Sequence, residues 1–468
     1  MSANSFVILD TLVKGLDFNG LKINNMYNGA YIYTLNRCRE MIRQAVQQSE
    51  YKNIIQNDLQ NDLQNDIIDA YLLNKMQKEY IPHITARIND IGKIPIVEQK
   101  SPEWFRLRED MISASDAGYF LKKCGNSKAV DSLKIKIGLK KYVNSNAPPL
   151  MHGNTFEDTA RAIYESRNGV SVTEYGIISS PTHCIGASPD GVVTACHLDT
   201  FECQSKYGRL LEIKNPYSRE IDNTVKPEYM VQILQQQYTM SLPICDFVET
   251  TIVDANCRND SSNYKPYITL TDMLNDKLDM SNPNWEKRVK NKNIPHTNLN
   301  KFGNEKGLVV WYSKRVAEGD TRHKYILYPL KLPYEEIAIK KWIVDMNSQQ
   351  FQEKYEYIQT KYWRLDVYSE KTVVYDKSVF EDDYVPKLCE IWEVICKCKA
   401  LKARGEDVAS YIEELENKKD NPFYNEKKRK KKVKIEDSFG DGTSDSGSGR
   451  IPSNTFSFKP DNDIELDF

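Results

Sequence analysis

Hydrophobic and polar positions in the middle of the chain predict two strands that bring acidic side chains together. Residues 183–193 form an apolar run with a Pro-Asp-Gly turn signal at Asp190, and residues 208–214 alternate with the period of a strand. This alternation places Glu212 and Lys214 side by side on one face. If the two strands pair, Asp190 meets Glu212 across the ladder.

The segments around these strands predict a sheet flanked by helices. An amphipathic helix is expected over 153–164 and a second helix over 227–240. Short strands are expected at 170–173 and 176–178, and an apolar strand at 245–253. This order is typical of an α/β fold with a central mixed β-sheet and helices on its faces. The core stripe of the first helix consists of Phe156, Ala160, Ile163 and Tyr164.

Composition changes along the chain predict four parts. A four-residue repeat at 56–67 gives an apolar stripe on a helix, which favours packing or a partner over chemistry. The four parts are a helical N-terminal extension (1–95), a core (96–260), a C-terminal α/β extension that completes or covers the core (261–420) and a disordered tail (421–468).

Beyond the core, further strands and helices are expected before the tail. Strands are predicted near 308–312 and 325–330, and helices over 335–363 and 384–417. The tail begins with a dense basic run at 427–434 and ends in acidic residues, a composition that cannot bury enough apolar surface to order itself. The basic run indicates nuclear localisation or nucleic-acid binding, with a solvated tail as the alternative.

Composition sets limits on the class of protein. The chain has 468 residues, with 40% hydrophobic and 28% charged, as in soluble globular proteins. It has no run of eighteen apolar residues and no secretory signal at the N-terminus, so no membrane association is expected. The ten cysteines form no Cys-x-x-Cys pair, which argues against zinc or iron–sulfur sites. With a net charge of −2, any nucleic-acid role must rest on a local basic surface.

Two carboxylates and a lysine at a strand end are suited to metal-dependent chemistry. Asp190 and Glu212 offer oxygen ligands for a hard cation, and Lys214 lies beside a water that the cation would polarise. Neighbouring Glu and Lys on a strand are also common on a solvated face. Glu157 leans toward the core stripe of its helix, so it is either a third acidic group of the site or an ordinary surface carboxylate.

Residues in the first part of the predicted core predict contacts with phosphate groups. Ser113 and Ser115 can cap a helix whose free N–H groups attract a phosphate, and Arg108 can add a bidentate contact. A lysine-rich stretch follows, in which Lys134 and Lys136 are candidates for tracking a nucleic-acid backbone. A surface arginine, a capping serine and a solvated lysine face are the ordinary alternatives.

Six motifs occur in the order seen in one family. The chain resembles lambda-type (YqaJ-like) viral recombination exonucleases of the PD-(D/E)xK nuclease superfamily, and within them the branch from large DNA viruses. The resemblance covers residues 101 to about 255. The motifs are Glu103–Arg108, Ile112–Ser115, Gly153–Glu157, Ser188–Gly191, Glu212–Lys214 and Tyr229–Gln232.

This resemblance implies a restriction-endonuclease-like core and cleavage of DNA that depends on Mg²⁺ or Mn²⁺, with two ions. It implies degradation of one strand of a DNA duplex from its ends, 5′ to 3′, in viral recombination, repair or replication with a single-strand annealing protein as partner. It also implies an intracellular protein, in the host cytoplasm (viral factory) or nucleus, or packaged in the virion. Some members form a ring-shaped homotrimer, which the terminal extensions here would block or replace.

The resemblance also assigns roles to individual residues. Asp190 and Glu212 would bind metal together with the backbone carbonyl of Ile213, and Lys214 would orient or deprotonate the attacking water. Glu157 would hold the second metal or its waters. Gln232 would align the second metal or its waters. Arg108 and Ser115, beside Ser113, would bind the terminal phosphate.

Two other classes of function stay open on the sequence. The same fold carries endonucleases and RNA-degrading enzymes, and the sequence does not reveal dependence on a DNA end. A non-catalytic nucleic-acid-binding or scaffold protein is the other alternative. The presence of Asp190, Glu212 and Lys214 together argues against that alternative, because a decayed site would be free to lose the set.

Overall fold

The structure is a computed structural model, and its described residues all fall within one compact unit. The repeat at 56–67, most of the predicted N-terminal extension and the predicted tail from 421 onward lie outside the described residues. The residues that the structure describes are 44, 48, 69, 70, 72–74, 76–98, 101–121, 123, 126–140, 147–254, 267, 269–275, 305–317, 320–347 and 355–417.

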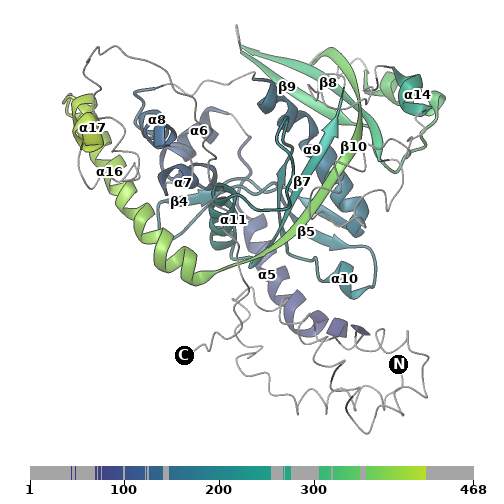
Figure 1. The fold of residues 1–468 in the computed structure, drawn as a ribbon, viewed down its shortest axis with the longest axis horizontal. Coiled ribbons are helices and arrows are strands. Elements are labelled where there is room, and N and C mark those ends of the chain that lie inside the picture. The colour runs from purple at the N-terminus through teal and green to yellow at the C-terminus, as the bar shows by residue number, and fades with distance from the viewer. Residues whose placement is uncertain are drawn as a thin grey trace, which may run out of the picture. The chain divides into compact units, whose positions relative to one another are not determined.

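A seven-stranded mixed sheet forms the centre of the described chain (Figure 1). Only the β6–β7 pair is parallel, and the other neighbours are antiparallel. The predicted α/β class with a mixed sheet flanked by helices is therefore confirmed. In spatial order the strands are β2 (Val170–Thr173), β5 (Gly191–Cys196), β6 (Leu210–Lys214), β7 (Ile244–Val253), β10 (Glu356–Val374), β8 (Lys306–Ala317) and β9 (Asp320–Leu327).

A second, three-stranded sheet changes the expected role of residues 183–193. Its strands are β1 (Ile112–Ser113), β4 (Ile185–Ala187) and β3 (Ile178–Ser179), in that order. The predicted apolar run is thus divided, because β4 belongs to this small sheet and β5 to the large one. The break falls at Pro189, which has no N–H group to donate to a ladder. Asp190 consequently stands between the two sheets.

Helices α9 (Pro148–Asn168) and α11 (Pro227–Met240) cover opposite faces of the large sheet. The predicted stripe of α9 is confirmed, since Phe156, Ala160, Ile163 and Tyr164 are fully buried. They pack with Leu211 and Ile213 of β6, whereas Ile233 and Met240 of α11 pack with Leu210 on the other face. The alternation along β6 therefore decides which side chains face which helix.

Helices that precede α9 in the chain pack against α11 and against the start of the large sheet. Helix α5 (Ile81–Gly92) buries Ile84, Ile88 and Ile91 in the same cluster as Leu210. Seven-residue α7 packs closely on α11. The first elements in chain order are η1 (Met76–Tyr80), α5, α6 (Pro102–Glu109), α7 (Ala114–Phe120) and α8 (Asn126–Lys136), with the short α10 (Phe201–Gln204) later in the core.

The C-terminal elements extend the same sheet. Strands β8 and β9 form a hairpin, and β10 joins it to β7 across one continuous ladder. The predicted helix over 335–363 is only partly correct. Helix α14 (Glu336–Met346) is shorter than predicted, and residues from 356 form β10, because both edges of that strand are paired with strands distant in sequence.

The last predicted helix, over 384–417, is two helices. After η3 (Ser378–Tyr384), helix α16 (Val385–Ala403) ends before Gly405, whose φ of +76° is left-handed, and α17 (Val408–Asn417) follows. The remaining elements are α12 (Leu270–Leu274) and α14 (Glu336–Met346), which pack near β8 and β10.

Among the helices that the structure describes, none combines the length and apolar character needed to cross a membrane.

Candidate active site

Asp190 and Glu212 come together at the junction of β5 and β6. Gly191 pairs with Leu211 in the antiparallel ladder, so the residue before β5 stands opposite Glu212. The backbone of Asp190 donates to the carbonyl of Leu211 (3.1 Å), and its Oδ2 accepts from the N–H of Ile213 (2.6 Å). The strand pairing expected from the sequence is thus present, and the loop carboxylate is held by the edge of β6.

Glu212 is a buried carboxylate with both oxygens engaged. Its side chain is 0% exposed, although it lies on a strand that ends in a cavity. Oε1 forms an ion pair with the ammonium of Lys214, and Oε2 accepts from Nε2 of Gln236 (2.7 Å). The same ammonium lies 5.3 Å from the centre of the Tyr229 ring. Lys214 is therefore held between a carboxylate and an aromatic face.

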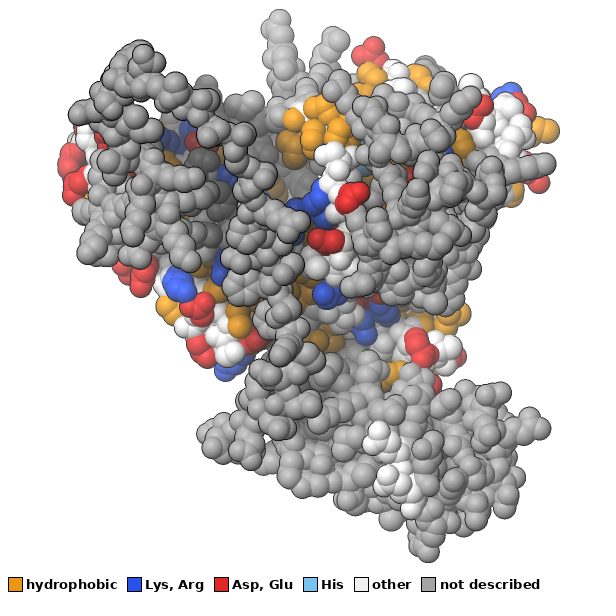
Figure 2. Space-filling view, viewed as in Figure 1, with side chains coloured by type: hydrophobic (Ala, Val, Ile, Leu, Met, Phe, Trp, Pro, Cys, Tyr) orange, Lys and Arg blue, Asp and Glu red, His pale blue; other side chains and the backbone are white. Residues whose placement is uncertain are grey.

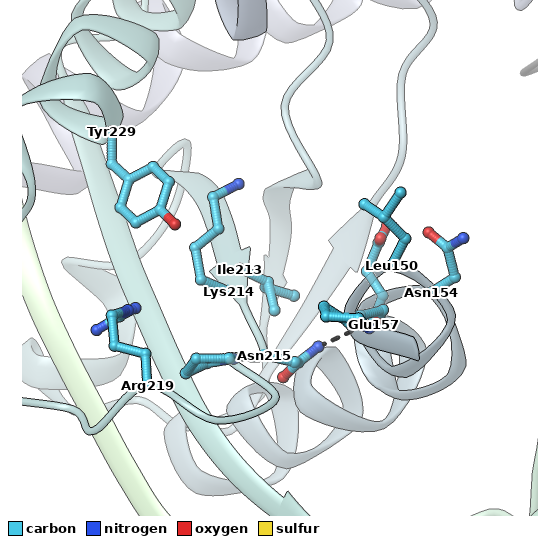
Figure 3. Close-up of a pocket in the computed structure, with 11 residues that line it drawn as sticks. Leu150, Asn154, Glu157, Ile213, Lys214, Asn215, Arg219 and Tyr229 are labelled. Carbon is cyan, nitrogen blue, oxygen red and sulfur yellow. Dashed lines mark hydrogen bonds between the residues drawn. The ribbon is translucent and has the colours of Figure 1, made fainter. Parts of the chain in front are cut away.

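A cavity of about 290 Å³ opens beside this group. Glu157 and Asn154 of α9 line it on one side, and Lys214 and Tyr229 on the other (Figure 3). Asn215 ties the two sides together, since its amide donates to the carbonyl of Gly153 at 3.5 Å. The predicted inward lean of Glu157 thus brings its carboxyl to the cavity that Lys214 also reaches.

Burial and neighbouring carboxylates raise the pKa of Asp190 and of Glu157. Burial, followed by the charges of Glu212 and Glu157, raises the pKa of Asp190 well above its usual value. Burial and the neighbouring Asp158 raise the pKa of Glu157 to about 6. Burial works against the Lys214 ammonium, but Glu212 and Asp190 outweigh it and raise the pKa of Lys214. The site therefore holds more negative charge than its one lysine balances.

The three carboxylates do not form a ready-made ligand cluster. Within the described part of the chain, no group of three or more His, Cys, Asp or Glu is placed to hold a metal ion. The predicted set of Asp190, Glu212 and Glu157 is not gathered around one point, because Glu157 is on α9 whereas Glu212 faces α11. The chemistry of these groups nevertheless fits a hard divalent cation, which prefers carboxylate oxygens as ligands. The raised pKa values of Asp190 and Glu157 show that their negative charges are not balanced by nearby positive charge, and a bound cation would balance them.

A second pocket of about 40 Å³ contains the predicted phosphate-binding residues. Nη2 of Arg108 donates to Oγ of Ser113 (2.8 Å) and to Oγ of Ser115 (3.1 Å). The guanidinium also lies 4.6 Å from the centre of the Trp104 ring. The sequence placed these groups near one another, and the structure joins them in one hydrogen-bonded cluster.

Gln232 belongs to this second pocket. The resemblance assigned it to the metal-binding shell, but the described hydrogen bonds to Glu212 come from Lys214 and from Gln236. The difference is one helical turn, because Gln236 follows Gln232 by four residues on the same side of α11. The signal for Gln236 was present in the sequence as a shared helix face, but the periodicity did not say which glutamine reaches the sheet.

Lys136 does not have the position expected for a lysine that tracks DNA. Its side chain is 5% exposed, and Nζ contacts Asp116 (3.0 Å) and the carbonyls of Arg108 (3.0 Å) and Met111 (2.8 Å). The prediction was wrong for this residue, because the last turn of α8 faces inward at this point. Lys134, on the same turn, is half-buried.

Asp116 was missed as a functional candidate by sequence reasoning. Its Oδ2 accepts from Ser113 (2.7 Å) and from Nη2 of Arg108 (3.4 Å), beside Lys136. Although burial opposes ionisation, the charges of Lys136 and Arg108 lower the pKa of Asp116. It is therefore an anionic support beneath the second pocket.

Charges on the outer surface are mixed. On the face shown in Figure 2, the described basic and acidic side chains lie next to one another in the middle of the molecule. This mixture agrees with the formal net charge of −2. The charged groups that matter for the candidate site are therefore those that line the two pockets.

Comparison with known proteins agrees with the family named from the motifs. Residues 103–241 match the model of the YqaJ-like viral recombinase domain. An uncharacterized protein of Acanthamoeba polyphaga mimivirus, R354, is 28% identical over 370 residues, which cover 74% of this chain and 60% of that protein. This chain therefore matches less than two thirds of the length of that relative.

Solved structures of one bacterial enzyme are also similar over part of the chain. The alkaline exonuclease LHK-Exo from Laribacter hongkongensis is 30% identical, with a TM-score of 0.27, over 32% of this chain and 74% of that protein. Its complex with dAMP gives 29% identity and a TM-score of 0.27, with the same coverage. The family match rests on the domain model, which matches residues 103–241, and on the motifs.

Proposed function

We propose that this protein is a metal-dependent deoxyribonuclease that degrades one strand of a DNA duplex from its end, 5′ to 3′. The observation that carries the proposal is the meeting of Asp190, Glu212 and Lys214 at the end of β6, beside an open cavity. Two carboxylates and a lysine beside a cavity suit metal-assisted hydrolysis of a phosphodiester. The family match over 103–241 supports a nuclease.

The residues of the cavity have separate roles in this proposal. Asp190, Glu212 and the carbonyl of Ile213 would hold the divalent cation, which supplies charge stabilisation and lowers the pKa of a bound water. Lys214 positions the attacking water through its ammonium, which already lies between Glu212 and Tyr229. Mg²⁺ or Mn²⁺ suits these oxygen donors, and a second ion would lie toward Glu157.

The second pocket supports recognition of a terminal phosphate. Arg108 presents a guanidinium between two serine hydroxyls, a donor set suited to a phosphate group. Helix α11 links the two pockets, because Tyr229 lines the first and Gln232 the second. Three residues of helix rise only about 4.5 Å, so a terminal phosphate and the next phosphodiester can lie along one helix.

Partners and location follow from the family in this proposal. The substrate is the end of duplex DNA, and a single-strand annealing protein would take up the strand that is left. In the same proposal the protein acts inside the host cell. It forms a ring-shaped homotrimer, or its terminal extensions replace that ring. The name of the solved relative, an alkaline exonuclease, supports end-dependent cleavage.

Digestion of end-labelled linear duplex and closed circular DNA, with Mg²⁺ and with EDTA, tests the proposal. We expect mononucleotide or short products from the linear substrate in Mg²⁺, an intact circle, and no products in EDTA. Asp190→Ala and Lys214→Ala should remain folded, bind DNA and lose cleavage. Digestion of linear ends by folded Asp190→Ala would contradict the assignment, and cutting of the circle would indicate an endonuclease.

A further inference from the structure

Helix α11 carries three consecutive buried glutamines, of which the middle one contacts the candidate catalytic carboxylate. Gln236 is 0% exposed, as is Glu212, and its Nε2 lies 2.7 Å from Glu212 Oε2. Its neighbours are equally buried but bind backbone. Gln235 donates to the carbonyls of Ile112 (2.8 Å) and Gly186 (2.9 Å), and Gln237 to those of Pro243, just before β7, and Val373, near the end of β10.

The orientation of the Gln236 amide follows from its surroundings. Turning the amide over would set Oε1 against an oxygen of Glu212, which is repulsive, so the N–H side must face the carboxylate. Oε1 then has no hydrogen-bond partner among the described residues. A buried acceptor without a partner is unfavourable, and a methionine of similar size would avoid that cost. The polar side chain at this position is therefore explained by its contact with Glu212.

The fold also limits how far Gln236 can move. Val231 and Leu234 of α11 pack into one hydrophobic cluster, and Ile233 and Met240 pack into another. A helix that is buried on both sides holds its side chains in fixed rotamers. The amide is thus a rigid support, in contrast to Lys214, which reaches the same carboxylate from the cavity side.

We propose that Gln236 is a positioning residue of the nuclease site. Its amide fixes one oxygen of Glu212, so that the other oxygen faces Lys214 and the carboxylate keeps the orientation needed to bind a divalent cation. This inference rests on the proposed function and extends it to a residue outside the six motifs. Partners that orient a metal-binding carboxylate typically change metal affinity or activity by about tenfold to a hundredfold when they are removed.

The test measures Mn²⁺ binding to the full chain without DNA, by electron paramagnetic resonance, so that it does not depend on cleavage. Gln236→Met keeps the volume and removes the donor, and we expect the Kd for Mn²⁺ to rise by about tenfold to a hundredfold. Gln235→Met is the matched control, because it lies next in sequence, is equally buried and loses two hydrogen bonds. It should lose thermal stability and keep its Mn²⁺ affinity.

Gln236→Asn serves as a second variant if Gln236→Met does not fold. Its amide is too short to reach Glu212, so we expect weaker Mn²⁺ binding with a preserved polar group. Folded variants of Gln236 that bind Mn²⁺ as tightly as the native chain would overturn the inference and leave the proposed function standing. A native chain that digests DNA ends without binding Mn²⁺ would overturn both.

Discussion

The buried ammonium of Lys136 lies 3.0 Å from Oδ2 of Asp116, and this ion pair supports the pocket around Arg108. The same carboxylate accepts from Ser113 at 2.7 Å, and the same lysine donates to the carbonyl of Arg108 at 3.0 Å. Lys136 of helix α8 therefore supports both Ser113, through Asp116, and Arg108, through its backbone carbonyl. A lysine that resembles a DNA-binding residue in the sequence is part of the support of the pocket.

Loss of this lysine should destabilise the protein and weaken phosphate recognition. In Lys136→Met, the half-buried Asp116 would lose its closest cation and keep the more distant Arg108, a loss that typically costs about 1–3 kcal/mol. Urea unfolding measures this loss. Lys134→Met, on the same turn of α8 but half-buried, should change stability by about 0.5 kcal/mol or less. Equal effects of the two substitutions would argue against a supporting role for Lys136.

Arg108 should discriminate between DNA ends with and without a phosphate. Arg108→Lys keeps the charge but loses the planar fork that donates to Ser113 and Ser115. We expect the preference for 5′-phosphorylated over 5′-hydroxyl ends to fall by about tenfold, which corresponds to the loss of one charge-assisted hydrogen bond. Parallel digestion of the two substrates measures it.

The exposed Arg106 provides the control for this experiment. It lies on the same helix, α6, and differs from Arg108 in facing solvent. Arg106→Lys should leave the preference for phosphorylated ends unchanged. A preference that survives in Arg108→Lys would place recognition of the terminal phosphate elsewhere.

Metal-free protein should become more stable when Asp190 loses its charge. Burial and the neighbouring carboxylates raise the pKa of Asp190, so its ionised form is unfavourable in the fold. Asp190→Asn retains an oxygen for the N–H of Ile213 and removes the repulsion. We expect a higher Tm than the native chain in EDTA, and no cleavage. Excess Mg²⁺ should raise the Tm of the native chain, through binding to the folded state, and not that of the variant.

Asp246 should contribute stability that is lost in acid. Burial favours its neutral form, but Arg209 (2.9 Å) and Lys206 (2.8 Å) outweigh burial and lower the pKa of Asp246. Because the pKa is lower in the folded than in the unfolded chain, the contribution is fully present above about pH 4, the unfolded value. It disappears as the pH falls toward the folded pKa.

Urea unfolding between pH 7 and pH 3 tests this sign. The native chain should lose on the order of 1 kcal/mol more than Asp246→Asn over this range, because the variant has no carboxylate to protonate. At pH 7 the variant should be the less stable of the two, since Arg209 remains buried without its ionic partner. Parallel pH profiles for the two proteins would contradict the account.

Local patterns in the sequence were sufficient to place the centre of the candidate site. The turn at Asp190 and the alternation from Leu210 to Lys214 are properties of short segments, and the pairing of the two strands, which the sequence left as a condition, is present in the structure. The inward stripe of α9 was likewise readable, because the period of a helix shows which side chains face the core. These features depend on neighbours in sequence.

Tertiary structure decided which partner each polar side chain has. The sequence did not distinguish buried Lys136 from a surface lysine, or Gln236 from Gln232, because each choice depends on an element far away along the chain. Residues after 355 became a strand for the same reason, since β10 pairs with β7 and β8 on its two edges. Periodicity encodes exposure to solvent, whereas the identity of a contact is set by packing of distant segments.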